Sequence, residues 1–386
     1  MRGPHRETYR RRVATIDPAR LLGSLAERAG APPVLPALTA GGLTWRPATR
    51  DDAGALLELR NTVAQADGEP YRESLEELRE ILGAPWQHLG TDSVLGLDDA
   101  GALRAYGYVE TMPGDTTRVR AFLWGAVHPV RRGEGIGREL FAWQEARARQ
   151  MLAESGKELP ARLAGFLEDT APAAKVRLYE RAGFTPRRFY SDLERDLRDL
   201  DAHPLPAVGL DDGLLLLPLD DEHDEPARLA HNDAFRDHWG SEPQTAEQWR
   251  SGRATYAPEW SFVVVDPQPD VAALLADPHT DADTSAALRA GEPLVVGYHV
   301  AARYEADFPV RGHPFGYTDI LGVRRAYRGR KVAVALLAAG MRAFAADGMA
   351  AAALDVDTQN PSGAHGLYAS LGYRKRHGSR LLTIEL

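Results

Sequence analysis

The sequence predicts an α+β fold made of two tandem copies of one domain, each a central mixed β-sheet flanked by helices. Three observations predict it. A strand–helix–strand order runs through the first part of the chain and then restarts, two short motifs recur in the same order in both parts, and 386 residues are enough for two hydrophobic cores.

The composition is that of an ordinary globular protein and excludes several kinds of chemistry. The chain is 44% hydrophobic and 26% charged, and its lack of cysteine excludes disulfides, thiolate metal sites and an acyl group carried on an enzyme thiol. A net charge of -9 argues against nucleic acid as a partner. No apolar run is long enough for a membrane span, and we expect no secretory signal. We expect a cytoplasmic protein without membrane contact, as a monomer or a homodimer.

Residues 1–42 are predicted to form a basic arm and a linker. The arm contains the basic run Arg10–Arg12, and the Pro-rich stretch Ala31–Pro36 and the pair Gly41–Gly42 follow. The basic run could bind an anionic partner or be a solvated extension, and we favour the extension.

The first domain is predicted over residues 43–200. Apolar runs predict the strands, amphipathic periodicity predicts the helices, and Thr49–Asp52 has the pattern of a helix N-cap. The expected elements are a strand at Leu43–Arg46, a helix at Ala53–Ala66, strands at Ser93–Leu97, Ala105–Glu110 and Ala121–Val127, and a long helix at Ile136–Ser155.

A charged, proline-containing segment at Asp196–Pro206 indicates a linker, placed at residues 201–212, and the second domain is predicted over residues 213–386. Its segment Pro267–Glu292 is expected to be a loop with one short helical piece. The other expected elements are strands at Leu214–Pro218, Ser261–Val265, Leu294–Ala301 and Asp319–Val323, and a helix at Glu225–His238.

The repeat is the strongest signal in the sequence. Val127–Gly137 aligns with Val323–Ala333 at an offset of 196 residues, which pairs Arg132 with Arg328 and Gly133 with Gly329. Downstream, LYERAGF at Leu178–Phe184 matches LYASLGY at Leu367–Tyr373. Two linked motifs that recur in the same order indicate duplication of a whole domain.

The repeated loop has the pattern of an anion site. A strand, then Arg-x-x-Gly-x-Gly, then a helix brings backbone N–H groups and a positive helix end together, and glycine lets the backbone approach the ligand closely. Arg132 or Arg328 would add charge near a pyrophosphate. A plain exposed turn is the alternative for one copy, but recurrence argues against it. The glycine spacing does not fit a dinucleotide-binding Rossmann motif.

These residues resemble the GNAT superfamily of N-acetyltransferases, whose acetyl-coenzyme A loop matches RGEGIG at Arg132–Gly137. RGRKVA at Arg328–Ala333 also matches, except that Lys331 replaces a glycine. The tandem arrangement, Asp355–Tyr373 and His231–Gly240 resemble tandem members of the mycothiol synthase type. The resemblance implies acetyl-CoA as co-substrate, no metal, and a small-molecule amine as acceptor. It implies coenzyme contacts at Gly125, Ala126, Val127, Arg132, Gly133, Glu134, Gly135, Ile136, Gly137 and Arg138, and at Leu321, Gly322, Val323, Arg328, Gly329, Arg330, Lys331, Val332, Ala333 and Asn360.

In enzymes of this family the amine attacks the thioester directly, and a tyrosine protonates the departing thiolate. The family pattern places this tyrosine at Tyr368, and at Tyr179 in the first repeat. Asn360 matches the family's pantetheine contact, whereas the first repeat has Ala171 at the equivalent distance. The two repeats have therefore lost different parts of the site.

The general base need only be a carboxylate, or a water chain, within reach of the amine. The family's glutamate position falls near Tyr317, so we propose Asp319 and Asp355 as candidates in the second domain. Glu110 is a weaker candidate in the first.

The resemblance also implies acceptor contacts at the end of the first helix of the second domain. Asp237, His238 and Trp239 fall there, and Glu110 is their counterpart candidate in the first domain. A histidine beside a tryptophan is as often a packing feature, so both interpretations stay open.

We therefore expect an N-acetyltransferase whose second domain is catalytic, while the first binds coenzyme A. The intact glycine loop leaves the first domain open as the catalyst instead. A non-catalytic acyl-CoA-binding or sensor protein is the alternative from another class. The sequence does not name the acceptor: small amines, aminoglycosides, amino-sugar thiols and protein N-termini all fit.

Overall fold

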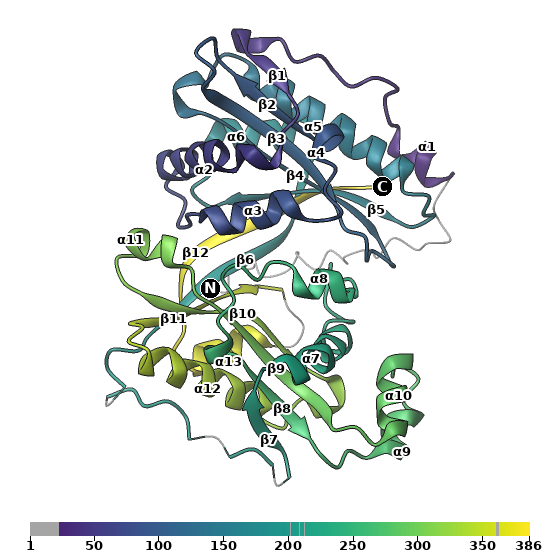
Figure 1. The fold of residues 1–386 in the computed structure, drawn as a ribbon, viewed down its shortest axis with the longest axis vertical. Helices are drawn as coiled ribbons and strands as arrows, with labels where there is room; N and C mark the ends of the chain where they lie inside the picture. Colours follow the sequence, from purple (N-terminus) through teal and green to yellow (C-terminus); the bar gives the residue numbers. More distant parts are fainter. Residues whose placement is uncertain (1–22, 201, 208, 212, 360–362) are drawn as a thin grey trace, which may run out of the picture.

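The computed structural model describes residues 23–386 except 201, 208, 212 and 360–362. Within that part of the chain, the strands form one continuous twelve-stranded sheet against which the helices pack (Figure 1). The predicted mixed sheet with flanking helices is confirmed. The basic run Arg10–Arg12 and the predicted coenzyme contact Asn360 lie outside the described residues.

The first half of the chain, residues 43–200, follows the predicted order closely. Thr49 and Asp52 form the predicted capping box, and the helix that follows ends at Gly68, which adopts a left-handed conformation with φ 66°. After a short helix α1 (Leu25–Ala29), the elements are β1 (Thr44–Arg46), α2 (Ala53–Asp67), α3 (Leu75–Gly83), α4 (Leu89–Asp92), β2 (Ser93–Leu97), β3 (Leu103–Thr111), β4 (Val119–Val127), α5 (Ile136–Glu154), β5 (Ala161–Glu168), α6 (Ala173–Arg181) and β6 (Thr185–Asp196).

The second half, residues 213–386, repeats this order with additional short helices. Its elements are β7 (Leu215–Pro218), α7 (Asp221–Ala234), α8 (Ala246–Arg250), β8 (Phe262–Asp266), α9 (Val271–Ala276), α10 (Ala282–Ala290), β9 (Leu294–Ala302), α11 (Phe308–Arg311), β10 (Phe315–Val323), α12 (Val332–Ala346), β11 (Ala351–Asp357), α13 (Ala364–Ser370) and β12 (Arg374–Glu385).

Several predicted boundaries of the second half were wrong: β10, for example, begins at Phe315 rather than at Asp319. Side-chain caps explain two of the differences. Helix α7 begins at Asp221, four residues early, because the side chain of Asp220 accepts a hydrogen bond from the His223 amide and caps it. The segment 267–292 contains two helices rather than one, and the side chains of Asp270 and Asp281 cap their first turns. Helix α7 also stops at Ala234, so residues 235–238 are loop.

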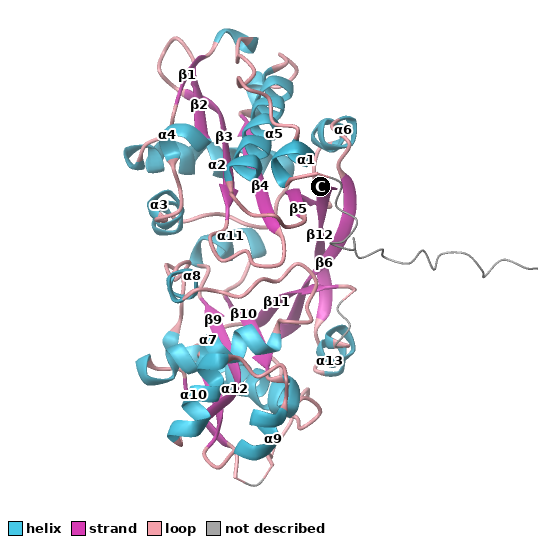
Figure 2. Ribbon diagram, turned by 90° about the vertical axis from the view of Figure 1, so that its right-hand side faces the viewer, coloured by secondary structure: helices cyan, strands magenta, loops and turns pink. Residues whose placement is uncertain are grey.

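The two halves exchange their last strands. The sheet order is β1-β2-β3-β4-β5-β12-β6-β11-β10-β9-β8-β7, so β12 pairs with β5 of the first half and β6 pairs with β11 of the second. Figures 1 and 2 show β6 and β12 running side by side across the middle of the molecule. We propose 43–200 and 213–386 as the limits of the two repeated units along the chain, although each sheet is completed by a strand of the other.

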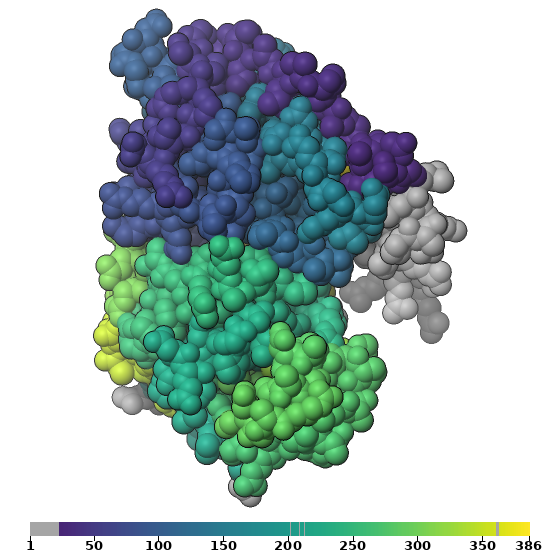
Figure 3. Space-filling model, turned by 45° about the vertical axis from the view of Figure 1, so that its right-hand side comes forward, coloured from purple at the N-terminus to yellow at the C-terminus, as the bar shows by residue number. Residues whose placement is uncertain are grey.

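The exchanged strands also complete the two cores. Leu382 of β12 is buried among Leu163, Leu167 and Tyr179 of the first half. Leu193 of β6 is buried with Tyr368 and other residues of the second half. The halves meet along a broad boundary, with α9 and α10 protruding from the second half (Figure 3). No helix of the described residues is both long and apolar enough to cross a membrane.

Candidate active site

The first of the two predicted anion-binding loops follows β4 and leads into α5. Gly133 and Gly135 both adopt left-handed conformations at φ 85°, and Gly135 directly precedes the helix. The free N–H groups and the positive end of α5 therefore converge on one place. A cavity of about 350 Å³ lies there. The predicted coenzyme residues that line it are Gly125, Ala126, Val127, Arg132, Gly133, Gly135, Gly137 and Arg138.

Two predicted residues of this loop do not line the cavity. Glu134 pairs with Arg131 at 2.9 Å, beside the loop. Ile136 is buried in a core cluster with Leu43 and Leu140, because the first turn of α5 directs it toward the sheet.

The second loop follows β10 and leads into α12. A cavity of about 480 Å³ lies over it. Arg330 does not line this cavity, because its guanidinium pairs with Asp211 at 2.7 Å. The predicted coenzyme residues that do line it are Leu321, Gly322, Val323, Arg328, Gly329, Lys331, Val332 and Ala333.

Lys331 takes over the backbone role of Gly135. It directly precedes α12 with φ 60°, and it is the only non-glycine residue with positive φ in the described part of the chain. The left-handed conformation costs a residue with a Cβ about 1–2 kcal/mol. The loop thus keeps its shape despite losing the glycine, and strain of this kind is typical of functional sites.

Each loop arginine is held by an aspartate at a matching place in its half: Asp67 is the last residue of α2, and Asp237 lies in the loop just after α7. Arg132 makes two hydrogen bonds to Asp67, at 2.6 and 3.1 Å. Arg328 makes the same pair to Asp237, at 2.8 and 3.0 Å, and this hydrogen bonding lowers the pKa of Asp237. Asp237, predicted as an acceptor contact, thus fixes the loop arginine.

Tyr179 and Tyr368 occupy matching places on α6 and α13 but have different surroundings. Tyr179 packs against Phe141 and Phe184 at ring distances of 4.7 and 5.3 Å, and it lines the first loop cavity. Tyr368 lines the second loop cavity and also a further cavity between the halves. Burial raises the pKa of Tyr368 to about 12, so its hydroxyl is a proton donor at neutral pH.

The central cavity is this space of about 590 Å³ between the two halves. It brings together five residues singled out from the sequence: Tyr368, Asp319, Asp355, His238 and Leu321. The first half contributes part of its wall through Trp86, Met112, Arg120 and Tyr190. An acceptor bound here would touch both halves of the chain.

Asp355 points into the central cavity from β11. Its side chain is exposed to the cavity, but the cavity itself lies between the two halves. Burial of the carboxyl group and the charge of the nearby Asp192 together raise the pKa of Asp355 to about 6. A carboxyl group with this pKa is ionised at neutral pH and can still accept a proton efficiently.

Asp319 lies in β10 at a bulge, where the register shifts between Thr318 and Ile320. The bulge turns Asp319 toward the central cavity, and its Oδ1 accepts a hydrogen bond from the Tyr304 hydroxyl at 3.3 Å. Burial raises the pKa of this carboxyl group as well.

The remaining predicted residues have distinct places. His238 lines the central and the second loop cavities, and burial lowers its pKa, so it is neutral at pH 7. Trp239 does not line the central cavity; its ring is stacked between Arg162 and Arg188. Glu110 accepts a hydrogen bond from Trp86 Nε1 at 3.1 Å and thereby orients a cavity wall.

Models of known families match both halves of the chain. An acetyltransferase (GNAT) domain model matches residues 93–186, and an acetyltransferase (GNAT) family model matches residues 232–373. A mycothiol acetyltransferase of Thermobispora bispora is 30% identical over 331 residues, which cover 85% of this chain and 94% of the relative. This chain belongs to the GNAT acetyltransferase family. A mycothiol acetyltransferase of Frankia alni is 29% identical, covering 82% of this chain and 87% of the relative.

Solved structures share the GNAT fold over most of the chain. A GCN5-related N-acetyltransferase from Sphaerobacter thermophilus has a TM-score of 0.61 at 24% identity, covering 89% of this chain and 95% of that one. A tandem GNAT protein from the clavulanic acid biosynthesis pathway also has a TM-score of 0.61, at 17% identity, covering 89% and 98%. The chain is thus an acyltransferase with two GNAT domains in tandem.

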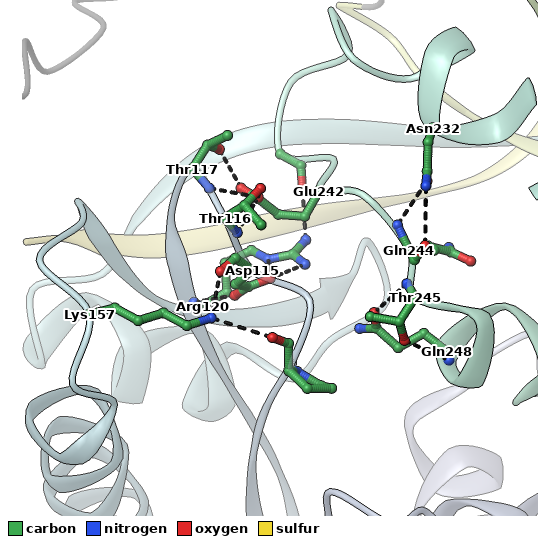
Figure 4. Close-up of polar contacts among 12 residues, drawn as sticks. Asp115, Thr116, Thr117, Arg120, Lys157, Asn232, Glu242, Gln244, Thr245 and Gln248 are labelled. Carbon is green, nitrogen blue, oxygen red and sulfur yellow. Dashed lines mark hydrogen bonds and ion pairs between the residues drawn. The ribbon is translucent and has the colours of Figure 1, made fainter. Parts of the chain in front are cut away.

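Sequence reasoning missed the residues of the first half that complete the central cavity of the second GNAT domain. Trp86, Met112, Arg120 and Tyr190 lie outside the repeated motifs, and only the docking of the halves brings them to this cavity. It also missed Glu242, whose Oε2 accepts hydrogen bonds from the amides of Thr116 and Thr117, both at 2.8 Å (Figure 4). No local pattern marks such a long-range contact.

Glu242 belongs to the segment 235–245, which forms one wall of the central cavity and is anchored to both halves. Arg120 Nη1 donates to the carbonyl of Gly240 at 2.7 Å, from the first half. Asn232 on α7 exchanges two hydrogen bonds with the backbone of Gln244, at 2.8 and 3.2 Å (Figure 4). We call residues 235–245 the acceptor loop.

Proposed function

We propose that this protein transfers an acetyl group from acetyl-CoA to a primary amine of a small molecule, and that the second half is the catalyst. One observation carries the proposal: Tyr368 lines both the second loop cavity and the central cavity. A group at that junction can reach the sulfur of a coenzyme on one side while an acceptor occupies the other.

The second loop and its cavity fit the phosphate and pantetheine parts of coenzyme A. The loop supplies the N-terminal N–H groups of α12 and the positive charge of Lys331, and the cavity of about 480 Å³ runs from the loop to Tyr368. The coenzyme supplies the activated thioester carbonyl. The first loop supplies the same features from α5 and Gly135, so both halves can hold a coenzyme.

The reaction needs two proton transfers. The amine nitrogen attacks the thioester carbonyl carbon, a C–N bond forms, and the C–S bond breaks with its electron pair on sulfur. A base must take the proton of the ammonium, and an acid must give one to the thiolate. Tyr368 is the acid in this proposal, because its pKa of about 12 keeps it protonated.

Asp355 is the base that we favour, because its pKa of about 6 leaves it ionised but basic at neutral pH. Asp319 is the second choice, since it opens to the same cavity. Both carboxylates come from the strands that flank the site, β11 and β10.

The first half lacks a carboxylate at the corresponding place. Counting back from each tyrosine, Phe166 occupies the position of Asp355, and its ring stacks on Phe122 and Trp124 at 6.3 and 6.0 Å. We therefore assign the first half a coenzyme-binding role without catalysis.

The names of the relatives provide a starting point for the choice of acceptors to test. Two of them are named mycothiol acetyltransferases, so a mycothiol-related amine belongs in any substrate panel, with other amino-sugar and simple primary amines. The central cavity has polar side chains that can hydrogen-bond such hydroxylated acceptors, among them Arg120, Ser241 and Gln248.

The test is release of free thiol from acetyl-CoA across this amine panel. Tyr368→Phe should lower kcat by about 10²–10⁴-fold, the usual contribution of general acid–base catalysis. Tyr179→Phe is the matched control and should leave turnover unchanged. Equal rates in wild type and Tyr368→Phe would refute the assignment. Coenzyme binding by calorimetry without turnover on any amine would instead indicate an acyl-CoA-binding protein.

A further inference from the structure

A second cavity lies between the halves, on the other side of the acceptor loop. It has a volume of about 400 Å³. It shares seven lining residues with the central cavity: Arg120, Phe235, His238, Gly240, Ser241, Glu242 and Pro243. Its walls are richer in positive charge than those of the central cavity, because five arginines line it: Arg118, Arg120, Arg162, Arg187 and Arg236. We call it the arginine cavity.

The acidic partners of these arginines do not neutralise all of them. Glu385 serves two, pairing with Arg118 at 2.8 Å and Arg162 at 2.7 Å. Arg120 pairs with Asp115 at 2.6 Å, and Arg236 lies 3.6 Å from Asp233. Among the described residues, no carboxylate pairs with Arg187. One side of the cavity therefore carries more positive charge than the chain itself balances.

Carboxylates on the other side of the cavity are mostly engaged elsewhere. Glu242 accepts from the amides of Thr116 and Thr117, and Asp281 caps the first turn of α10 through Thr284. Asp283, on the same helix, is exposed at the outer wall. None of them makes an ion pair with Arg187.

Arg187 reaches the cavity through a strand irregularity. In the β6–β12 register Arg188 pairs with Leu381 and Pro186 with Leu382, so Arg187 has no partner position. Irregularities of this kind redirect a side chain out of the normal alternation. The Nε group of Arg187 is buried without a hydrogen-bond acceptor among the described residues, whereas the Nε group of Arg188 lies 3.5 Å from Asp357 Oδ2. Buried N–H groups of this kind usually have a partner, which here would come from a ligand or water.

Trp239 completes the site from the acceptor loop. Its ring is sandwiched between the guanidinium groups of Arg162 at 4.0 Å and Arg188 at 4.3 Å. Burial, and the repulsion of Arg187, lower the pKa of both of these arginines. The stack fixes the Arg162 guanidinium, which also binds Glu385, in the cavity wall with Arg187, and guanidinium planes match carboxylate and phosphate oxygens.

We propose that the arginine cavity binds an anionic group, a carboxylate or a phosphate, of a small molecule, with Arg187 as the principal ligand and Arg162 and Arg236 beside it. This site is separate from both coenzyme loops and adjoins the central cavity, with which it shares part of its wall. Because Trp239 and His238 of the acceptor loop lie in its wall, the bound anion would also fix the conformation of that loop.

The probe is inorganic phosphate, titrated by calorimetry into the full-length protein saturated with coenzyme A. Saturation fills both loops, so that phosphate cannot bind there. Wild type should bind phosphate, and Arg187→Gln should weaken binding at least about tenfold through loss of a charge-assisted contact. Arg187→Lys should restore part of the affinity, because the charge remains.

The matched control is Arg374→Gln, an exposed arginine on β12 whose loss changes the net charge equally. It should bind phosphate as the wild type does. If Arg187→Gln does not fold, as judged by its melting curve, Arg236→Gln removes charge from the opposite wall and takes its place. Absence of binding in the saturated wild type, or equal affinities in Arg187→Gln and Arg374→Gln, would overturn the proposal.

Two sources of the anion are distinguished by a pair of amines, an α-amino acid and its decarboxylated counterpart. If the anion belongs to the acceptor, the amino acid competes with phosphate and Arg187→Gln abolishes the competition, whereas the decarboxylated amine does not compete. If the anion is a separate molecule, neither amine displaces phosphate. Both results support an anion site and identify what fills it.

Discussion

Asp355 on β11 stands directly opposite Asp192 on β6 in the antiparallel register, so the two halves place two carboxylates face to face. Arg311 of α11 pairs with Asp192 at 2.8 Å and offsets part of the repulsion. Because β6 comes from the first half, a strand exchanged between the halves adjusts the protonation of the proposed base. The exchange is therefore part of the site as well as of the core.

A pH dependence follows from this pairing. The base acts only when ionised, and its pKa is about 6, so kcat/KM should rise with pH through this value and then level off. Asp355→Asn should lower kcat/KM by about 10²–10⁴-fold and remove the rise. Asp192→Asn removes a like charge, lowers the pKa of Asp355 and should move the rise to lower pH.

The stability of the Asp355→Asn variant provides a second readout. A carboxyl group whose folded-state pKa is raised disfavours folding once it ionises, so its contribution to stability is lost as pH rises through about 6. Asp355→Asn should therefore raise the melting temperature at pH 8 relative to wild type, and have little effect at pH 4. An unchanged pH–rate profile in this variant would transfer the role of base to Asp319.

Lys331 allows a prediction about the second loop. Lys331→Gly should relieve the backbone strain at φ 60°. Because glycine also has a greater entropy in the unfolded state, the net increase in the free energy of unfolding should be about 0–1 kcal/mol. Gly135→Ala introduces the same strain in the first loop and should cost about 1 kcal/mol. Thermal melting measures both changes.

Coenzyme affinity then separates strain from charge in this loop. Lys331→Ala keeps the Cβ and removes the charge, so it should weaken coenzyme A binding without changing the melting temperature of the free protein. If Lys331→Gly and Lys331→Ala both bind the coenzyme as wild type does, the ammonium group has no part in binding.

The exchanged strands predict that the two halves unfold together. Leu193 of β6 is 3% exposed and lies in the core of the second half, so Leu193→Ala should cost about 2–5 kcal/mol. Phe189 lies on the same strand but is 43% exposed, so Phe189→Ala should change stability by less than about 0.5 kcal/mol. One cooperative transition is expected in each case; two separate transitions in wild type would contradict the shared core.

Local patterns were sufficient to predict the repeated elements and both loops. Gly135 and Arg132 belong to a motif whose chemistry depends on neighbours in sequence, and Thr49 with Asp52 is a cap that can be read directly. The strand exchange could not be predicted in this way, because Leu193 and Leu382 have the same alternating pattern whichever sheet they join. The central cavity was out of reach for the same reason: Trp86 and Asp355 meet only after the halves dock.

The acceptor loop yields the last prediction. Glu242 of this loop binds the amides of Thr116 and Thr117 in the first half and so holds one wall of the central cavity. Glu242→Gln replaces charge-assisted hydrogen bonds by weaker ones, at a cost of about 1 kcal/mol. Because Glu242 holds the wall in place without acting on the reacting atoms, the acceptor KM should rise about fivefold while kcat stays within about twofold.

Glu247→Gln, an exposed neighbour on α8, is the control and should behave as wild type. Steady-state kinetics at saturating acetyl-CoA separates the two constants. A fall in kcat with unchanged KM would mean that the contact of Glu242 with Thr116 and Thr117 acts on the chemistry rather than on acceptor binding.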